Sequence, residues 1–375
     1  MRFSSTSLHK TLCVTALIPL FTACVNLAPG MRIDHQQPAQ SAEANVTPII
    51  KLITPDLIVS EKASRAQLPQ QDLSALIGTP VPYTIGRGDI LSILVWDHPE
   101  LSVASIPVQS LASNATNFVQ TPAGFVVDHN GMVQFPFVGP IRLAGLTELE
   151  ARNLLADKLV RVIKKPDITL RVQSFRSKRI YVDGEVKTPG NQVIDDVPMT
   201  LLEGLTRAGG FVPTADQSEI HVNRAGVTYR INLPSLVQRG IDPSGIMLTS
   251  GDVVHVRARD ENKIFVLGEV TTPKALPMVN GRMTLNQALG EVGGVNPLSS
   301  EARQVYVIRN ADAKNPLVYN LDARSPVALA LAENFELNPK DVVYVDASGL
   351  ARFSRIVNLI IPSSAAVTTL YRDTR

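Results

Sequence analysis

Polar and apolar residues alternate through a stretch near residue 90. One face of the strand predicted there carries Leu91, Ile93 and Val95, and the other carries Ser92, Leu94 and Trp96. The Gly88-Asp89 pair before this strand predicts a tight turn, in which glycine supplies a positive φ and aspartate caps its own turn. The pattern therefore indicates a turn and a half-buried strand at the start of a first module.

The remainder of the first module reads as strands followed by a helix. Residues 124–145 alternate as strands around Asn130-Gly131, a pair typical of hairpin turns. A helix that opens with the Thr147-Glu150 capping box is expected to run to about Lys164, and a strand follows over residues 168–173. These elements predict a small α+β module.

A second kind of module occurs twice further along the chain. The first copy contains "IYVDGEVKTPG" (180–190) and "MTLLEGLTRAGG" (199–210), and the second contains "IFVLGEVTTPK" (264–274) and "MTLNQALGEVGG" (283–294). The offset between the copies is the same at both anchors, which indicates a duplicated unit. Each copy adds a strand that ends in arginine, at 220–224 and 305–309, and closes with "GDVVHV" (251–256) or "KDVVYV" (340–345).

Local chemistry indicates the shape of the duplicated unit. Thr200 with Glu203, and Thr284 with Gln287, each predict a helix that begins with a capping box. Glycine pairs at 209–210 and 293–294 are suited to ending these helices, while Gly184 and Gly268 fall where a bulge or tight turn belongs. Each copy is therefore expected to be a small sheet packed on one helix. The chain as a whole is predicted to hold three α+β modules in series.

The first 23 residues resemble an export signal. A basic region that ends at Lys10 precedes an apolar run too short to span a bilayer, and small residues follow. The run ends in "LFTAC", which resembles the lipobox of bacterial lipoproteins, with Cys24 as the acylated residue. Cleavage elsewhere, with Cys24 an ordinary residue, is the alternative. Val25 stands where an inner-membrane retention signal usually has aspartate, which favours the outer membrane.

Composition and charge narrow the function further. The chain is 45% hydrophobic and 19% charged, enough apolar material for two or three cored domains. Without its first 23 residues it holds 34 basic and 34 acidic side chains, so no net charge favours nucleic acid. Residues 25–82 are rich in Pro, Gln, Ala and Ser and are expected to form an extended leader, in which 47–60 supplies a strand or two.

Catalytic and metal motifs are not found in the sequence. The six histidines show no helical or loop spacing of metal ligands, and Asp97-His98 and Asp128-His129 are neighbours on extended chain, which point to opposite faces. No nucleophile elbow, phosphate loop or Cys-x-x-Cys occurs. The sequence predicts a protein that is not an enzyme and that needs no metal or other cofactor.

The C-terminal segment has a helical pattern with a narrow polar stripe. Its apolar side carries Phe353, Ile356, Val357, Ile360, Val367, Leu370 and Tyr371, with Leu359 and Ile361 at the edges. Its polar stripe carries Ser354, Arg355, Asn358, Ala365, Thr369 and Arg372, and Pro362 is expected to kink or divide the helix. A helix over residues 350–371 is about 33 Å long, close to the roughly 30 Å core of a bilayer.

Three interpretations of this helix follow from its pattern. It can pack on its own domain with Arg355 and Arg372 in water, or lie flat on a membrane, although its polar face has few basic residues. It can also span the membrane, which requires several copies closed around water so that the polar stripe avoids lipid. The pattern alone leaves these interpretations open.

Taken together, these segments resemble the Wza-type capsule polysaccharide export lipoproteins of the outer membrane. The resemblance rests on "GRGDILSILVWDHPEL", "GMVQFPFVGPIRLAGLT", "ITLRVQSFRSKRIYVDGEV", the duplicated unit and "RFSRIVNLIIP". It implies an α+β multidomain fold: a polysaccharide-export domain, two tandem β-grasp modules of the soluble-ligand-binding type, and a C-terminal amphipathic transmembrane helix.

The resemblance also divides the chain into segments. They are a signal peptide (1–23), a lipid-anchored leader (24–82), the export domain (83–175), repeat 1 (178–258), repeat 2 (262–346) and the transmembrane helix (350–373).

A function follows from the same resemblance. It implies a ring-shaped homo-oligomer, octameric in the best-matched members, that exports capsular or extracellular polysaccharide through an α-helical barrel. Its implied partners are an inner-membrane polysaccharide co-polymerase, often a tyrosine autokinase, the polysaccharide and outer-membrane lipid. Ser354, Arg355, Asn358, Thr369 and Arg372 would face the lumen, the apolar side would face lipid, and the C-terminus would reach the cell surface. The alternative is a periplasmic glycan-binding or scaffolding lipoprotein without a pore.

Overall fold

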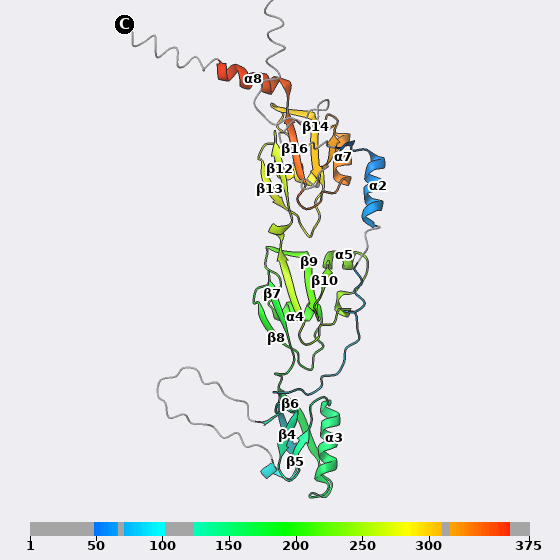
Figure 1. Ribbon diagram of the computed structural model, residues 1–375, viewed down its shortest axis with the longest axis vertical. Coiled ribbons are helices and arrows are strands. Elements are labelled where there is room, and N and C mark those ends of the chain that lie inside the picture. Colours follow the sequence, from blue (N-terminus) through cyan, green and yellow to red (C-terminus); the bar gives the residue numbers. More distant parts are fainter. Residues whose placement is uncertain (1–48, 67–70, 102–123, 310–315, 361–375) are drawn as a thin grey trace, which may run out of the picture. The chain divides into compact units, whose positions relative to one another are not determined.

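A computed structural model describes residues 49–66, 71–101, 124–309 and 316–360, with the backbone alone for 356–360 (Figure 1). The chain divides into two compact units. One unit, Gln70–Ala258, holds the first module and repeat 1. The other joins the chain up to Pro69 to the chain from Arg259 onward, and it holds repeat 2.

The first module is a three-stranded antiparallel sheet, in the order β3-β2-β6, with helix α3 packed against it. Leu91, Phe135, Leu155 and Leu159 are fully buried in the core between them. Its elements are β2 (Ile90–Val95), η2 (Pro99–Leu101), β3 (Phe125–Val126), β4 (Met132–Phe135), β5 (Gly139–Arg142), α3 (Glu148–Leu159) and β6 (Ile168–Ser174).

The alternation predicted for the first strand is confirmed. Leu91, Ile93 and Val95 are buried, whereas Leu94 and Trp96 are exposed on the opposite face. The preceding turn also forms as predicted, because Gly88 has φ 89° and the Gly86 amide donates to Asp89 Oδ2 at 2.8 Å. Alternation and turn chemistry were sufficient here because both are local.

Two details of the first module differ from the sequence prediction. Helix α3 begins with the predicted Thr147 capping box but ends at Leu159 and not near Lys164. The β-branched residues Val160 and Val162, which follow Leu159, are poor helix formers. The turn at Asn130-Gly131 exists, yet β3 and β4 do not pair across it, since β3 pairs with β2 and β4 with β5.

The two repeats share one topology, which supports the duplication. Repeat 1 has the strand order β10-β9-β11-β7-β8, and repeat 2 has the matching order β15-β14-β16-β12-β13. In each, the last strand is parallel to the first and antiparallel to the long strand beside it.

The elements of repeat 1 are β7 (Arg179–Gly184), β8 (Gly190–Val193), α4 (Leu201–Arg207), β9 (Ala215–Arg224), β10 (Val227–Ile231), α5 (Leu233–Gln238), η3 (Pro243–Gly245) and β11 (Val253–Ala258). After η4 (Arg259–Glu261), those of repeat 2 are β12 (Lys263–Gly268), β13 (Lys274–Pro277), α6 (Leu285–Glu291), β14 (Ser300–Arg309), β15 (Leu317–Leu321), α7 (Val327–Asn334) and β16 (Val342–Ala347).

Each repeat contains a second short helix, so the prediction of one helix was wrong. In repeat 1 this helix is α5, which Asn232 caps through the Ser235 amide at 2.9 Å and which has proline in its first turn. In repeat 2 it is α7, which packs beside α6. Both are too short to show a clear periodic pattern.

The leader packs on the repeats over much of its described length, so the expected extended form holds only in part. Strand β1 (Ile49–Leu52) pairs in parallel with β15 at the edge of repeat 2, and helix α2 (Pro55–Ala66) packs beside α7 (Figure 1). In the other unit, Leu76 is buried in the core of repeat 1, and its carbonyl accepts from the Met247 amide at 2.8 Å. The leader thus completes both repeats.

Candidate functional site

The C-terminal helix α8 (Gly349–Ile360) follows β16 and is tied to repeat 2 by two ion pairs. Arg352 Nη2 lies 2.6 Å from Asp346 Oδ1, and the Asp346 side chain is almost fully buried. One turn later, Arg355 donates to Glu269, at the start of the loop after β12. Because the two arginines are three residues apart, they lie on one side of α8, and this side faces repeat 2.

These pairs set the electrostatics where α8 meets repeat 2. Burial is the largest single influence and by itself would raise the pKa of Glu269, but the hydrogen bonds from its neighbours and the charge of Arg355 together outweigh it, so the pKa lies below its ordinary value. Burial raises the pKa of Tyr344 on β16, and the charge of Asp346 adds to the rise. Glu269 therefore stays ionised at neutral pH and holds the guanidinium of Arg355.

The predicted site residues are placed only in part. Ser354 is exposed and its hydroxyl donates to the Ala351 carbonyl, Arg355 pairs with Glu269, and Phe353 is half-buried. For four more residues the helix backbone alone is described: Ile356, Val357, Asn358 and Ile360. The rest lie outside the described residues: Cys24, Val367, Thr369, Leu370, Tyr371 and Arg372.

In the described ranges, no helix is both long enough and apolar enough to cross a membrane. Helix α8 is described over Gly349–Ile360 only. The spanning helix expected over 350–373 therefore stays a prediction.

An arginine paired with a buried aspartate occurs at the same place in both repeats. In repeat 1, Arg224 Nη2 donates to Asp252 Oδ2 at 2.6 Å and to the Met247 carbonyl at 2.6 Å. In repeat 2, Arg309 Nη2 donates to Asp341 Oδ2 at 2.9 Å and to the Glu336 carbonyl at 3.1 Å. Each pair joins the long strand to the turn before the last strand.

The outer nitrogen of each arginine holds the leader. Arg224 Nη1 donates to the Ala75 carbonyl at 2.8 Å, and Arg309 Nη1 donates to Glu61 Oε2 of α2 at 3.2 Å. Tyr319 also donates to Glu61, at 2.9 Å. Both arginines are visible in the sequence as the last residues of repeated strands, but their contact with the leader is not. A signal for the pairing was present, since in each repeat an arginine ends the long strand and an aspartate stands before the last strand.

Asp89 joins the first module to the segment that enters repeat 1. Its buried carboxylate accepts from the Tyr83 hydroxyl at 2.7 Å and from the Arg176 and Ser177 amides at 2.8 Å each. Burial raises the pKa of Tyr83, and the adjacent Asp89 raises it further. The turn predicted from Gly88-Asp89 is therefore also a junction between two modules of one unit.

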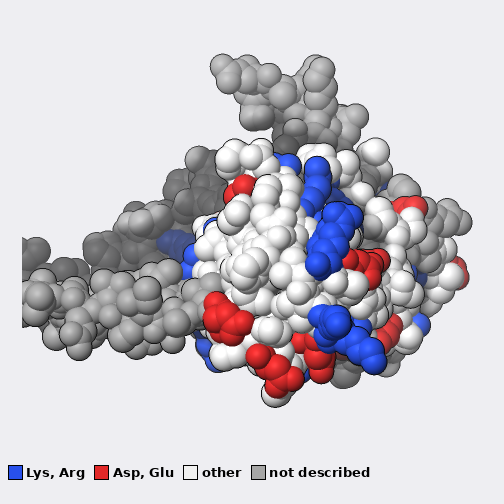
Figure 2. Space-filling model, turned by 90° about the horizontal axis from the view of Figure 1, so that it is seen from below, with Lys and Arg blue, Asp and Glu red and all other residues white. Residues whose placement is uncertain are grey.

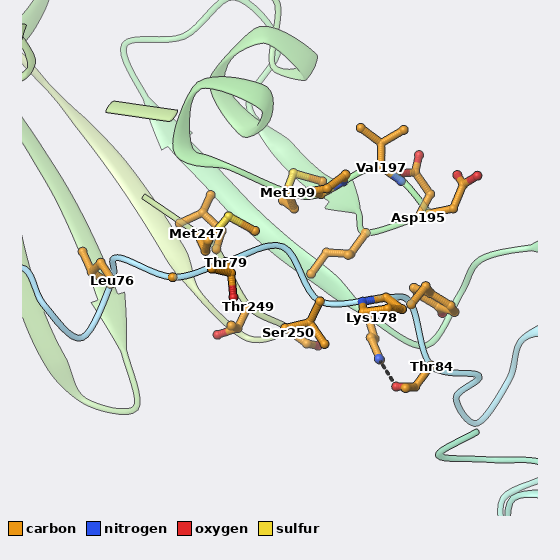
Figure 3. Close-up of a pocket in the computed structure, with 18 of the residues that line it drawn as sticks. Leu76, Thr79, Thr84, Lys178, Asp195, Val197, Met199, Met247, Thr249 and Ser250 are labelled. Atoms are coloured by element: carbon orange, nitrogen blue, oxygen red, sulfur yellow. Dashed lines mark hydrogen bonds between the residues drawn. The ribbon is translucent and has the colours of Figure 1, made fainter. Parts of the chain in front are cut away.

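A cavity of about 560 Å³ lies between the leader segment 75–84 and repeat 1. Figure 3 shows this segment passing beside repeat 1, with Lys178 directed toward Thr84, whose hydroxyl lies 2.6 Å from Lys178 Nζ. Burial lowers the pKa of Lys178, and Asp89 partly opposes the shift. Met199 and Met247 give the cavity apolar walls, and its lining includes neither histidine nor cysteine.

Comparison with known proteins identifies the modules. Residues 78–173 match the sequence family described as polysaccharide biosynthesis/export protein, and residues 178–256 and 262–345 each match the SLBB domain. The chain is 50% identical over 371 residues to the EPS I polysaccharide export outer membrane protein EpsA of Ralstonia solanacearum, covering 97% of each chain.

More distant relatives have related names. The chain is 23% identical over 346 residues to the capsule polysaccharide export outer membrane protein CtrA of Neisseria meningitidis serogroup A, covering 86% of this chain and 87% of the relative. It is 25% identical over 311 residues to the capsule polysaccharide export protein BexD of Haemophilus influenzae, covering 76% of each.

This chain belongs to the family of outer-membrane polysaccharide export proteins. Its α+β fold places the export family sequence before the tandem SLBB domains, in the order the sequence predicted. The alignment with the Ralstonia export protein covers 97% of this chain, so the relation reaches beyond the three modules into the leader and the C-terminal segment.

The surface chemistry of this export protein is mixed. The face in Figure 2 carries separate groups of both charges around an area of uncharged side chains. Within the described ranges no three His, Cys, Asp or Glu side chains gather as metal ligands. His98 pairs with the exposed Glu100 at 2.8 Å, and not with its neighbour Asp97.

Proposed function

We propose that this protein is an outer-membrane lipoprotein that forms a ring-shaped channel for capsular or extracellular polysaccharide. In this proposal Cys24 carries the lipid, the modules stand in the periplasm, and the C-terminal helices of several copies form a barrel through the outer membrane. The polymer passes through the lumen without any bond being made or broken, so the protein is no enzyme and needs no cofactor apart from the covalent lipid.

One observation carries the export role. The relative from Ralstonia solanacearum, named a polysaccharide export outer membrane protein, is 50% identical along 97% of both chains. At that identity the fold and general role are shared. The capsule export names of the relatives from Neisseria and Haemophilus support the same class of cargo.

The ring-shaped channel draws its support from the C-terminal segment. Its polar stripe is too polar for lipid, and a closed ring gives that stripe water while the apolar side contacts acyl chains. We assign Ser354, Asn358, Thr369 and Arg372 to the lumen side, and we assign Arg355, expected there from the sequence, to the base of the helix, where it pairs with Glu269. The pairs of Arg352 and Arg355 with repeat 2 hold the base of each helix to its own periplasmic module.

The proposed partners follow from the direction of transport. Other copies of the chain supply the ring, with eight copies as the expected number. The periplasmic end meets an inner-membrane polysaccharide co-polymerase, often a tyrosine autokinase, because the channel itself holds no energy source. Electron microscopy of the detergent-extracted particle measures the number of copies directly.

Deletion of residues 350–375 tests the channel. The truncated protein is expected to reach the periplasm and to keep its folded modules, because the repeats hold their own cores. Surface polysaccharide, measured with a polymer-specific antibody on whole cells, is expected to be lost. Full-length protein expressed from the same promoter is the matched control, and normal export by the truncated protein would contradict the proposal.

A second candidate function is a periplasmic glycan-binding or scaffolding lipoprotein whose tail packs on repeat 2. The contact of Arg355 with Glu269 favours it, because that contact needs no membrane. An epitope tag placed after Arg375 distinguishes the two. Antibody is expected to label the tag on intact cells in the channel proposal, whereas a packed tail leaves the tag inaccessible until the outer membrane is opened.

A further inference from the structure

The sheet of the first module has an open outer face. Helix α3 covers the inner face, and the outer face of β3-β2-β6 is exposed where the structure describes it. Three of its side chains are large and apolar: Leu94, Trp96 and Val126. Four are polar: Ser92 on β2, and Thr169, Arg171 and Gln173 on β6. We call this surface the outer face.

Trp96 is held in place although it is 55% exposed. Its indole Nε1 donates to Thr169 Oγ1 at 3.2 Å, and its backbone amide donates to the Asp167 carbonyl at 2.9 Å. A ring tied at its nitrogen loses little further entropy when a ligand binds to it. The indole is therefore pre-organised as a flat apolar surface.

Polar side chains flank the apolar ones in register. Across the ladder, Ser92 is opposite Arg171 and Leu94 is opposite Thr169. Residues rise about 3.4 Å each along a strand, so Thr169 lies beside the indole, whereas Ser92 and Arg171 lie roughly 13 Å further along the sheet. This arrangement places polar groups where the next sugars of a chain would lie when one ring rests on Trp96.

A pyranose ring has the complementary chemistry. One of its faces presents C–H groups, which pack on an aromatic ring, and its edge presents hydroxyls, which need hydrogen-bond partners when they leave water. Arg171 adds a donor pair suited to the carboxylate of an acidic sugar. The outer face offers each of these groups on adjacent strands.

Other occupants fit the outer face less well. A stable protein interface covers about 800 Å² on each partner, and three apolar side chains separated by polar ones supply too little for a second copy. Nucleic acid needs several cations along a backbone, and this surface has one, Arg171. A peptide strand adds to the edge of a sheet and not to its face.

We infer that the outer face binds pyranose rings of the exported polysaccharide, with Trp96 as the stacking platform and Thr169, Arg171 and Ser92 as polar contacts. This inference rests on the proposed export function and names its contact with the cargo. Successive sugars bind weakly there and exchange, which suits a surface along which a polymer moves.

The sole tryptophan gives a direct test, because Trp96 is the only one in the chain. Full-length protein in detergent is titrated with oligosaccharides released by mild acid from the polysaccharide of the same cells, and indole emission is recorded. A saturable change in emission is expected. Unchanged emission at saturation, with binding confirmed by calorimetry, overturns the inference.

Variants test the role of the ring by calorimetry. Trp96→Ala is expected to weaken oligosaccharide binding at least tenfold, and Trp96→Phe, which keeps an aromatic ring, less than threefold. Phe137→Ala is the matched control, since Phe137 is a more exposed aromatic residue on the β4–β5 turn of the same module. An equal loss in the control, or no loss in Trp96→Ala, overturns the inference. Thermal melting confirms that each variant folds.

Two further experiments distinguish a failure of this inference from a failure of the proposed export function. Disaccharides from peptidoglycan present pyranose rings of another origin, and their equal binding would overturn the assignment to the exported polymer. Surface polysaccharide is measured in cells that lack the gene. Normal export there refutes the proposed function itself, whereas gene-dependent export without oligosaccharide binding at Trp96 refutes this inference alone.

Discussion

At the scale of single residues, two glycines explain why the last strand of each repeat can lie so close to the first. Gly184 and Gly268 have φ of 84° and 86°. A Cβ at these positions would lie 2.0 Å from the Val256 carbonyl oxygen and 2.1 Å from that of Val345. The amide after each glycine donates to the same carbonyl at 2.9 Å. Glycine is therefore required by both conformation and space.

Replacing one of these glycines is expected to destabilise its repeat. Gly268→Ala should lower the free energy of unfolding by at least about 2 kcal/mol, because the positive φ and the carbonyl contact each penalise a side chain. Gly290→Ala, in helix α6 with open space around its Cβ, is the control and should raise stability by about 0.5–1 kcal/mol. Urea unfolding of the two variants measures both changes in stability, which are expected to have opposite signs. Equal unfolding midpoints would contradict this expectation.

At the scale of elements, Arg224 and Arg309 each join the leader to one repeat. The side chains of Arg309 and Asp341 are 6% and 1% exposed. Each buried charge therefore needs the opposite charge of the other. Glu61 on α2 is more exposed and meets Arg309 at the outer edge of this pair. The arginine is thus shared between the core of repeat 2 and the leader.

Replacing Arg309 should reduce the stability of the protein much more than replacing Glu61, its partner in the leader. Arg309→Met is expected to lower the free energy of unfolding by about 3–5 kcal/mol, because it leaves Asp341 buried without a counter-charge. Glu61→Gln removes a partly exposed pair and should cost about 1 kcal/mol or less. Denaturant unfolding followed by circular dichroism measures both, and similar costs would show that Arg309 serves the leader alone.

The elements that sequence predicted best are those fixed by local chemistry. Neighbouring residues are enough to predict the two faces of β2 and the Thr284 capping box. The duplication is visible because the same segments occur twice. Glu203 shows the limit, since Thr200 caps the Glu203 amide but Arg207 takes the carboxylate that would complete the box. The packing of β1 and α2 on repeat 2 was not predicted, because the residues they contact lie far away in the sequence.

The candidate site was predictable to the same degree. The helical pattern predicted α8 from its first turn, and Gly349–Ile360 is helical. The contacts of Arg352 and Arg355 were not predictable, since Asp346 and Glu269 are brought beside α8 only by the pairing of β16 with β12, which the sequence does not state. The outer face of the first module, by contrast, was visible as the alternation of Ser92, Leu94 and Trp96.

At the scale of the whole molecule, the attachment of the C-terminal helix depends on acidity. The pKa of Glu269 in the folded protein lies below its ordinary value of 4.5, because the hydrogen bonds from its neighbours and the charge of Arg355 together outweigh the effect of burial. A carboxylate of this kind adds stability above its ordinary pKa, and the contribution is lost as pH falls through the folded value. The pair of Glu269 with Arg355 therefore supports the helix at neutral pH and weakens in acid.

Glu269→Gln tests this dependence. Thermal melting of the wild-type protein between pH 7 and pH 3 is expected to fall more steeply below pH 4.5 than that of the variant, whose pair is already lost. At pH 7 the variant should be less stable by about 1 kcal/mol or less, since Arg355 is partly exposed. Parallel pH curves for the two proteins would show that the pair contributes nothing.

The route of the leader has a consequence for the order of folding. Glu61 meets Arg309 and Tyr319 across separations of 248 and 258 residues, so β1 and α2 are synthesised long before the strands that receive them. Contacts of such long range fold slowly, and an unpaired strand exposes amide groups meanwhile. Repeat 2 reaches its complete form only when nearly the whole chain has emerged. Strand β1 and helix α2 are thus made early but are among the last parts to become native.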